Sequence, residues 1–113
     1  MVDAETLNTH LQELRRGTVV VACLVILQHE DYGYALLERL AEAGVSTEAN
    51  TLYPLLRRLE KQGLLVSVWN TDQARPRKFY RTSSTGRELA ALLLKDWASL
   101  HRAIATLEQG ASS

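Results

Sequence analysis

Apolar residues recur at helical spacing between residues 50 and 63, which read NTLYPLLRRLEKQG. Their i, i+3, i+4, i+7 stripe predicts a helix with one buried face, formed by Leu52, Leu55, Leu56 and Leu59. The opposite face is cationic and hydrogen-bonding, and consists of Thr51, Tyr53, Arg57, Arg58 and Lys61. Such a helix suits the major groove of DNA, but an ordinary amphipathic helix with a solvated basic face has the same pattern. The neighbouring segments decide between these interpretations.

Upstream, residues spaced by four and three predict a first helix over residues 4–28, with a seam of Leu7, Leu11, Leu14, Thr18, Val21 and Val25. Gly17 interrupts this helix at a cost of up to about 1 kcal/mol. The second half is apolar all round, so we expect it to be buried on two sides, against its own domain and against a second subunit.

Residues 32–62 have the spacing of a helix-turn-helix. Asp31 is the expected N-cap of a helix over residues 32–43, which Gly44 ends as the C′ residue. The second helix is expected from about Thr47, with Ser46 as a good N-cap and a first turn distorted by Pro54.

Residues 64–81 predict a β-hairpin, because two apolar and aromatic runs flank a polar turn that includes Gln73. A hairpin directly after a recognition helix is a wing. Its returning side carries Arg75, Arg77 and Lys78, which can meet backbone phosphates or a minor groove. The hairpin also carries three aromatic residues, Trp69, Phe79 and Tyr80. We expect them to pack across the two strands and not to stack on DNA bases.

A final helix is expected over residues 84–108, with Ser83 as its N-cap. Its apolar residues are spaced by four and three, as in a helix that packs on another helix: Leu89, Leu93, Trp97, Leu100, Ile104 and Leu107. The first and last helices would therefore form a homodimer. The fold class is mainly α with a two-stranded β wing, in one winged helix-turn-helix domain over residues 1–113 with N- and C-terminal dimerisation helices.

The distribution of charge supports a nucleic-acid partner although the formal net charge is zero. Residues 49–81 contain seven basic and two acidic residues, so this segment carries +5 and the remainder −5. The basic excess falls on the predicted recognition helix and wing. Double-stranded DNA is therefore the expected partner.

Other classes of function lack the residues that they need. The three histidines are far apart without metal-binding spacing, and we find no nucleophile elbow or phosphate loop, so we expect no metal, no cofactor and no enzyme activity. Cys23 is the single cysteine and fits a buried structural thiol inside the cell, in the cytoplasm. The apolar run over residues 19–27 is too short to span a membrane and too far from the N-terminus for a signal peptide.

Five motifs occur in the order found in the PadR family of bacterial transcriptional regulators, and the chain resembles the short subfamily of these proteins over nearly its whole length. They are LRRGT (14–18), YGY (32–34), NTLYPLLRRLEKQGLL (50–65), RPRKFYRTS (75–83) and GRE (86–88). The resemblance implies a winged helix-turn-helix homodimer that binds an inverted-repeat operator and represses transcription until a small molecule or other signal releases it.

The resemblance also implies roles for single residues. Tyr53, with Asn50 and Thr51, would enter the groove. Arg57, Arg58 and Lys61 would contact phosphates or a guanine, although one of the two arginines could instead bond within the domain. The alternative to operator binding is a winged-helix module that contacts only proteins.

In some short members of the family, a tryptophan of the last helix lines a pore at the dimer interface and binds flat aromatic ligands. Trp97 matches that position, and the pore would be lined by Val20, Leu24, Leu93, Trp97 and His101. An aromatic small-molecule effector follows from this interpretation. The competing interpretation is that Trp97 only packs in the dimer seam and binds no ligand. His101 stands where an acid would hold a cationic drug, which argues against cationic effectors.

Overall fold

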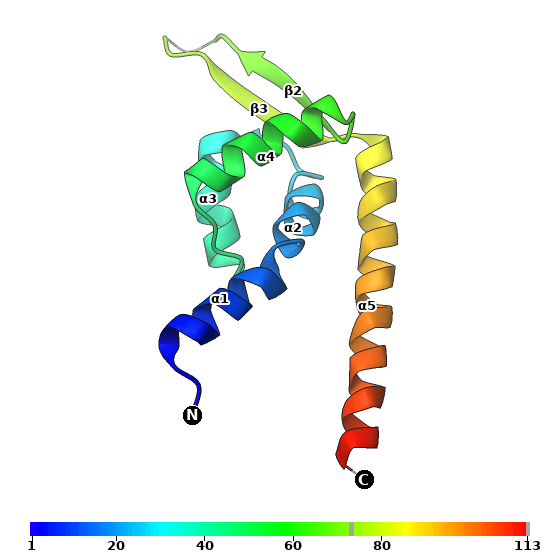
Figure 1. Cartoon of the computed structure of the whole chain (residues 1–113). Helices are drawn as coiled ribbons and strands as arrows, with labels where there is room; N and C mark the ends of the chain where they lie inside the picture. The colour runs from blue at the N-terminus through cyan, green and yellow to red at the C-terminus, as the bar shows by residue number, and fades with distance from the viewer. Residues whose placement is uncertain (73, 113) are drawn as a thin grey trace.

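The computed structural model describes residues 1–72 and 74–112, and its fold is mainly helical with one small sheet (Figure 1). In chain order its elements are α1 (Ala4–Arg15), α2 (Thr18–Ile26), β1 (Asp31–Tyr32), α3 (Gly33–Glu42), α4 (Ala49–Lys61), β2 (Leu65–Asn70), β3 (Arg77–Thr82) and α5 (Ser84–Ser112). The sheet is antiparallel with the order β1-β3-β2, and β2 and β3 form the expected hairpin. The mainly α fold with a β wing is confirmed, with one short strand added, whereas dimerisation through the terminal helices stays a prediction. Gln73 lies outside the described residues.

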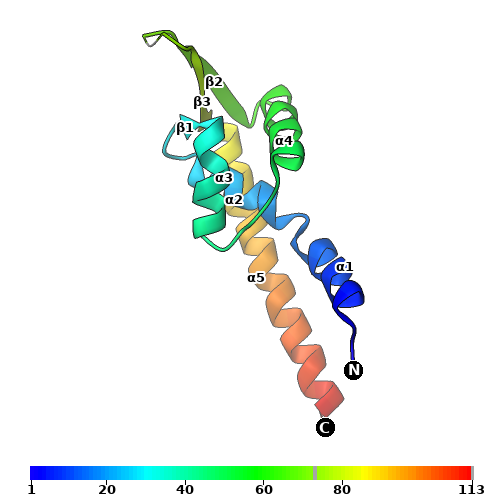
Figure 2. The same cartoon turned by 90° about the vertical axis from the view of Figure 1, so that its left-hand side faces the viewer.

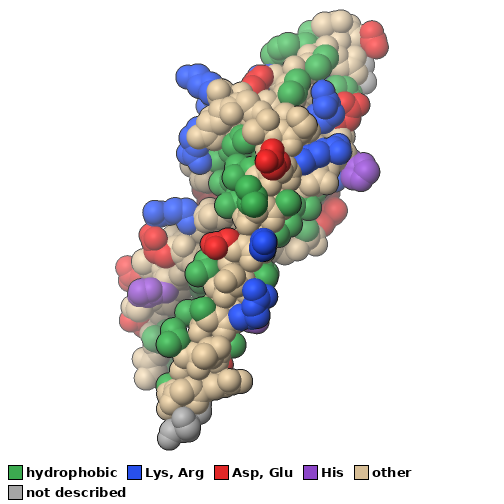
Figure 3. Space-filling model, turned by 90° about the vertical axis from the view of Figure 1, so that its right-hand side faces the viewer, with side chains coloured by type: hydrophobic (Ala, Val, Ile, Leu, Met, Phe, Trp, Pro, Cys, Tyr) green, Lys and Arg blue, Asp and Glu red, His purple; other side chains and the backbone are tan. Residues whose placement is uncertain are grey.

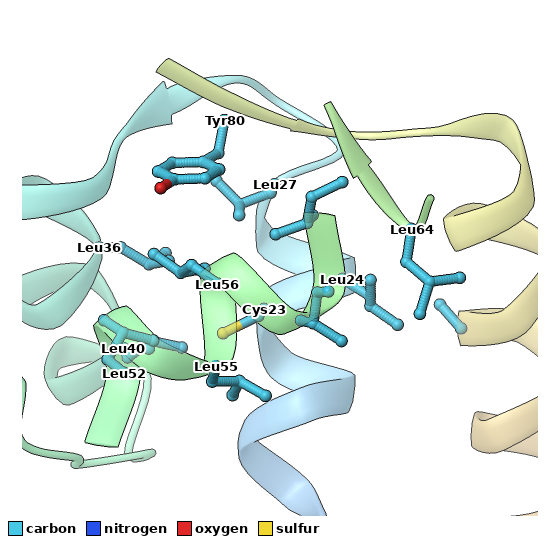
Figure 4. Close-up of a cluster of buried hydrophobic side chains, with 13 residues drawn as sticks. Cys23, Leu24, Leu27, Leu36, Leu40, Leu52, Leu55, Leu56, Leu64 and Tyr80 are labelled. Carbon is cyan, nitrogen blue, oxygen red and sulfur yellow. The ribbon is translucent and has the colours of Figure 1, made fainter. Parts of the chain in front are cut away.

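The core lies where α2, α3 and α4 meet beneath the sheet, and it consists largely of leucine (Figure 4). The four leucines of the predicted stripe on α4 are all buried in it, next to Cys23 of α2 and Leu36 of α3. Burying each leucine contributes about 1.5–3 kcal/mol, so this face holds α4 against the domain. Burial also raises the pKa of the Cys23 thiol to about 12, as expected of a structural cysteine.

A glycine turn joins α3 to α4, as the sequence predicts. Gly44 follows α3 with a φ of +91°, and the Val45 N–H donates to the Leu40 carbonyl at 2.8 Å. This pattern closes the last turn of a helix and needs a residue without a Cβ at the left-handed position. The confirmed Gly44 turn therefore sets the path by which the chain enters α4.

The first helix differs from the prediction, because it is two helices that meet at Arg16 and Gly17. No residue of α1 is buried, whereas α2 contributes Cys23 and Leu24 to the core. No other part of the domain packs against Gly17, since a Cβ added there would meet no atom within 4 Å. α2 therefore follows the core of the domain, and α1 leaves it with its apolar stripe uncovered.

The predicted N-cap of α3 was also wrong. Asp31 lies in β1, where it pairs with Tyr80 of β3, and the N-cap position is Tyr32 without a side-chain hydrogen bond. The carboxylate of Asp31 instead accepts from the Tyr32 N–H at 2.8 Å and from Arg39 Nη1 at 2.9 Å. A strand of two residues has too short a pattern to be recognised in sequence.

The junction between β3 and α5 fastens three elements together. Thr82 is buried and bonds to the end of α2: its N–H donates to the Leu27 carbonyl and its hydroxyl to the Leu24 carbonyl, both at 2.8 Å. Ser83 caps α5 as predicted, since its Oγ accepts from the Gly86 N–H at 3.0 Å. The same hydroxyl donates to the Gly63 carbonyl at 2.7 Å, so the start of α5 is tied to the end of α4.

Only the first part of α5 packs on its own domain. Ala90 is buried and Leu89 and Leu93 pack against the core, but the helix continues past it to the end of the molecule that also holds α1 (Figures 1 and 2). There Trp97, Leu100, Ile104 and Leu107 are 58–68% exposed. Figure 3 shows hydrophobic side chains exposed along this face. Among the described residues no helix is long and apolar enough to cross a membrane.

Two glycines of α5 should respond in opposite ways to substitution by alanine. A Cβ at Gly86 would lie 2.7 Å from Thr82 Cγ2 and even closer to the Leu64 carbonyl oxygen, so Gly86→Ala should lower the free energy of unfolding by about 1–3 kcal/mol. Gly110 has nothing within 4 Å of its Cβ position, so Gly110→Ala should stabilise slightly or do nothing. Urea unfolding followed by circular dichroism measures both. Equal stability of the two variants would contradict the close approach at Gly86.

Candidate nucleic-acid interface

The outward crest of α4 is formed by residues at positions i, i+4, i+7 and i+11: Asn50, Pro54, Arg57 and Lys61. All four are exposed, because the leucine face opposite them is held in the core. Within the described part of the chain, neither Arg57 nor Lys61 has a hydrogen-bond or ion-pair partner. The crest therefore presents uncompensated positive charge to solvent.

Pro54 lies in this crest, which the sequence analysis did not expect. α4 begins at Ala49 with Glu48 at the N-cap position, instead of at Thr47 with Ser46 as the N-cap, and Pro54 lies inside the helix beyond its first turn. A proline has no N–H, so it cannot bond to the carbonyl of Asn50. The helix hydrogen bond from residue 54 to residue 50 is therefore missing from α4.

The remaining predicted groove residues lie on the two flanks of α4. Thr51 and Arg58 face α1 and line a groove of about 760 Å³ with Arg15 and Arg16. Tyr53 lies on the flank toward the wing, half-buried against the core. Among the described residues neither Arg57 nor Arg58 has a hydrogen-bond or ion-pair partner within the domain. The structure thus places Asn50, Arg57 and Lys61 on one exposed face of α4, with Tyr53 half-buried beside Arg57.

Lys78 of the wing is engaged with α4 instead of standing free. Its Nζ lies 3.1 Å from Glu60 Oε1, and the Ser67 hydroxyl donates to the other oxygen of the same carboxylate. The hydrogen bond from Ser67, followed by Lys78, lowers the pKa of Glu60. Burial opposes the charge of Lys78, but the bond to Glu60 and nearby charge raise its pKa overall. These contacts tie both strands of the wing to α4.

Arg77 projects on the other face of the wing and meets aromatic residues from the start of α3. Its Nη1 donates to the Tyr34 hydroxyl at 2.6 Å, and its guanidinium carbon lies 4.9 Å from the centroid of that ring. Tyr34 stacks on Tyr32, which stacks on Phe79 of β3 at a centroid separation of 3.9 Å. These tyrosines belong to the YGY motif, whose residues had no predicted role. Arg75 is exposed near the end of the wing.

The expected packing of the three aromatic residues of the wing holds for two of them. Tyr80 is buried and Phe79 is stacked, but Trp69 is 61% exposed. Trp69 pairs with Lys78 near the far end of the hairpin, where the domain no longer covers the sheet. Val68, its neighbour on the opposite face, is 62% exposed. The wing therefore extends beyond the core with both faces open.

The same arrangement of helices and hairpin is found in known proteins. Residues 23–92 match the model of the transcriptional regulator PadR-like family. The crystal structure of a PadR family transcriptional regulator from Eggerthella lenta is similar, with a TM-score of 0.87 and 44% identity over 91% of this chain and 92% of that one. The chain belongs to the PadR-like family.

Two further relatives agree. The transcriptional regulator Rv3488 of Mycobacterium tuberculosis is 38% identical over 81 residues, which cover 68% of this chain and 73% of that protein. A PadR-like transcriptional regulator from Bacillus cereus has a TM-score of 0.75 and 25% identity over 86% of this chain and 97% of its own. The family and these relatives are transcriptional regulators and not enzymes, so this PadR-like chain is a DNA-binding transcriptional regulator with a winged-helix fold.

The residues suggested for a ligand pore in this PadR-like protein do not all share one surface. Trp97 and His101 are exposed and stack with ring centroids 6.5 Å apart. Val20, half-buried on α2, lines the groove between α1 and α4, whereas Leu93 is half-buried on α5. Leu24 is fully buried in the domain core, so it has no surface to offer a ligand and its assignment to the pore was wrong. Trp97 and His101 are the exposed members of the set.

The ion pair between wing and helix should make stability depend on pH. The folded protein holds the Glu60 pKa below its ordinary value, so its contribution is fully present above about pH 4.5 and is lost as the pH falls through the lowered pKa. At pH 7, Glu60→Gln should reduce the free energy of unfolding by about 1 kcal/mol or less, because the pair is partly exposed. At a second pH, well below that lowered pKa, the variant and the parent should converge.

Chemical unfolding at the two pH values measures this difference, and Glu42→Gln, at an exposed position of α3, is the matched control. A deficit of Glu60→Gln that is unchanged at the lower pH would show that the charge of Glu60 is not what anchors the wing.

Proposed function

We propose that this chain is a homodimeric repressor that binds an inverted-repeat operator in the cytoplasm and releases it when a signal arrives. The crest of α4 would enter the major groove, while the wing would contact the backbone beside it. The observation that carries the proposal is that Arg57 and Lys61 have no partner among the described residues and stand on a helix whose opposite face is buried. Free cations on a rigid element are what phosphate contacts and guanine recognition require.

The structure supports different roles for the predicted DNA-binding residues. Asn50, Arg57 and Lys61 lie on the crest and are assigned to the groove and its edges. Thr51 and Arg58 lie on the flank beside Arg15 and Arg16, where they would meet a phosphate strand. Tyr53 is half-buried, so only the exposed edge of its side chain would contact DNA. Lys78 is assigned to the support of the wing instead of to phosphate.

The proposed dimer uses the surface that α5 leaves uncovered. Its second half exposes apolar residues with the spacing of a helix seam, and Leu7 and Leu14 of α1 are 49% and 78% exposed at the same end of the molecule. Such stripes on monomers usually mark an interface. A second copy fits best, because a two-fold axis brings an identical seam to each stripe and spaces two recognition helices for an inverted repeat.

The proposed effector would be a planar aromatic compound that stacks on Trp97. Trp97 is 63% exposed and lies beside His101, so a pair of such residues from two copies would offer aromatic surfaces on both sides of a ligand. Packing of Trp97 within the seam is the competing role. A winged-helix module that contacts only proteins is the second candidate function, favoured by the open apolar faces of the wing at Val68 and Trp69.

Removing one crest cation should weaken DNA binding and its dependence on salt. Arg57→Ala and Lys61→Ala should each lower affinity by about tenfold at low salt and flatten the slope of log K against log salt by about 1. Lys95→Ala, which removes an exposed cation from α5, is the matched control and should change neither. Fluorescence anisotropy with the DNA immediately upstream of the coding sequence, and with random duplex, measures both. Unchanged slopes for both crest variants would favour the protein-contact module.

The seam should respond to one buried charge. Leu100→Glu places a carboxylate in the proposed interface, so light scattering should report monomers. Operator affinity should also fall, because a monomer has only one DNA-binding domain. Ser99→Glu adds the same charge one residue away on an exposed position and should remain dimeric. A Leu100→Glu protein that stays dimeric would exclude this seam.

The effector surface should be visible in tryptophan emission. Trp69 is also exposed, so the experiment uses Trp69→Phe, in which Trp97 is the single tryptophan. Planar aromatic compounds should quench its emission and release operator DNA, and Trp97→Phe should bind DNA without responding to them. If no member of a broad panel quenches the emission, Trp97 is a packing residue.

A further inference from the structure

A cluster of aromatic rings joins the start of α3 to the outer face of the wing. Tyr32 stacks between Tyr34 and Phe79, with centroid separations of 5.3 and 3.9 Å. The amide of Asn70 donates to the Tyr32 hydroxyl at 3.2 Å, so β2 is attached to the same cluster. Three strands and a helix therefore hold the two tyrosines in place, and Arg77 lies against their exposed side.

The guanidinium of Arg77 is held by this cluster in two ways. Nη1 donates to the Tyr34 hydroxyl at 2.6 Å, which fixes its direction, and the guanidinium carbon lies 4.9 Å from the Tyr34 centroid and 5.7 Å from that of Tyr32. A free arginine on a hairpin would lose much side-chain entropy when it binds. Here that ordering has already taken place in the free protein.

Most of the hydrogen-bonding capacity of Arg77 is left for an external group. Arginine has five N–H donors in a planar fork, and the bond to Tyr34 uses one. Within the described residues Arg77 has no acidic partner, in contrast to Lys78, whose ammonium is paired with Glu60. Of these two neighbouring cations, Arg77 is therefore the one that is both oriented and available.

We propose that Tyr34, supported by Tyr32, is a positioning residue that holds Arg77 in the orientation from which the wing contacts the phosphate backbone of DNA. This inference rests on the proposed DNA-binding function and assigns to Tyr34 a role in affinity, without contact to DNA of its own. Preorganisation is the physical basis: the tyrosine removes orientations of Arg77 that cannot bind. An aromatic cluster that merely fastened the wing to α3 would stabilise the fold without acting through Arg77.

A double-mutant cycle separates these roles. Tyr34→Phe keeps the ring and removes the hydroxyl that accepts from Arg77, and should weaken binding to the upstream DNA by about threefold. Arg77→Ala should weaken it by about tenfold. In the Arg77→Ala background, Tyr34→Phe should have no further effect, because the group that it positions is gone. Val68→Thr, at a position of the same wing face that is 62% exposed, is the control and should bind like the parent.

Two readouts accompany the anisotropy titrations. Thermal unfolding should give nearly the same Tm for Tyr34→Phe and the parent, and the NMR signal of the Arg77 Nε–Hε group should lose its restricted character in Tyr34→Phe. Losses that multiply in the double variant, or that follow a fall in Tm, would overturn the proposal in favour of a structural staple. Unchanged binding by Tyr34→Phe or by Arg77→Ala would also overturn it and leave the crest of α4 to bind DNA. A parent protein that binds no DNA would defeat the proposed function itself.

Discussion

The burial of one leucine face fixes the direction in which α4 presents its other face. Leu52, Leu55, Leu56 and Leu59 are enclosed by α2 and α3, and a rotation of α4 about its axis would bring charged residues into contact with that apolar core. The crest with Arg57 and Lys61 is thus held outward by packing, with no ion pair needed to orient it. The glycine turn at Gly44 and the junction at Ser83 set where the helix starts and ends relative to this core.

The wing in turn depends on contacts to both of its faces, from α4 on one side and from the start of α3 on the other. Glu60 holds Lys78 and Ser67 on the face toward the helix, and the tyrosines at the start of α3 hold Arg77 on the other. The two sides use different chemistry, because one ion pair neutralises its cation whereas the aromatic contact leaves the charge of Arg77 exposed. Lys78 and Arg77 are neighbours on one strand but have different roles, which a count of charges along the sequence does not reveal.

The sequence predicted the features that come from periodicity and local chemistry. The buried stripe of α4, the left-handed Gly44 and the Ser83 cap all follow from residue types at fixed spacing. The features that it missed depend on partners distant in sequence. The strand at Asp31 and Tyr32 exists only by pairing with β3, and the pairing of Lys78 with Glu60 joins residues on separate elements. Leu24 shows the same limit, since an apolar helix gives no sign of which side its own domain covers.

The central claim is that two copies of this recognition surface, joined through α5, read two half-sites on one face of DNA. A hydroxyl-radical footprint of the parent protein on the DNA upstream of its coding sequence tests it most directly. The account predicts two protected blocks related by inverted sequence and centred about one helical turn, roughly 10 base pairs, or a multiple of it apart. A single protected block, or protection without sequence preference, would contradict it.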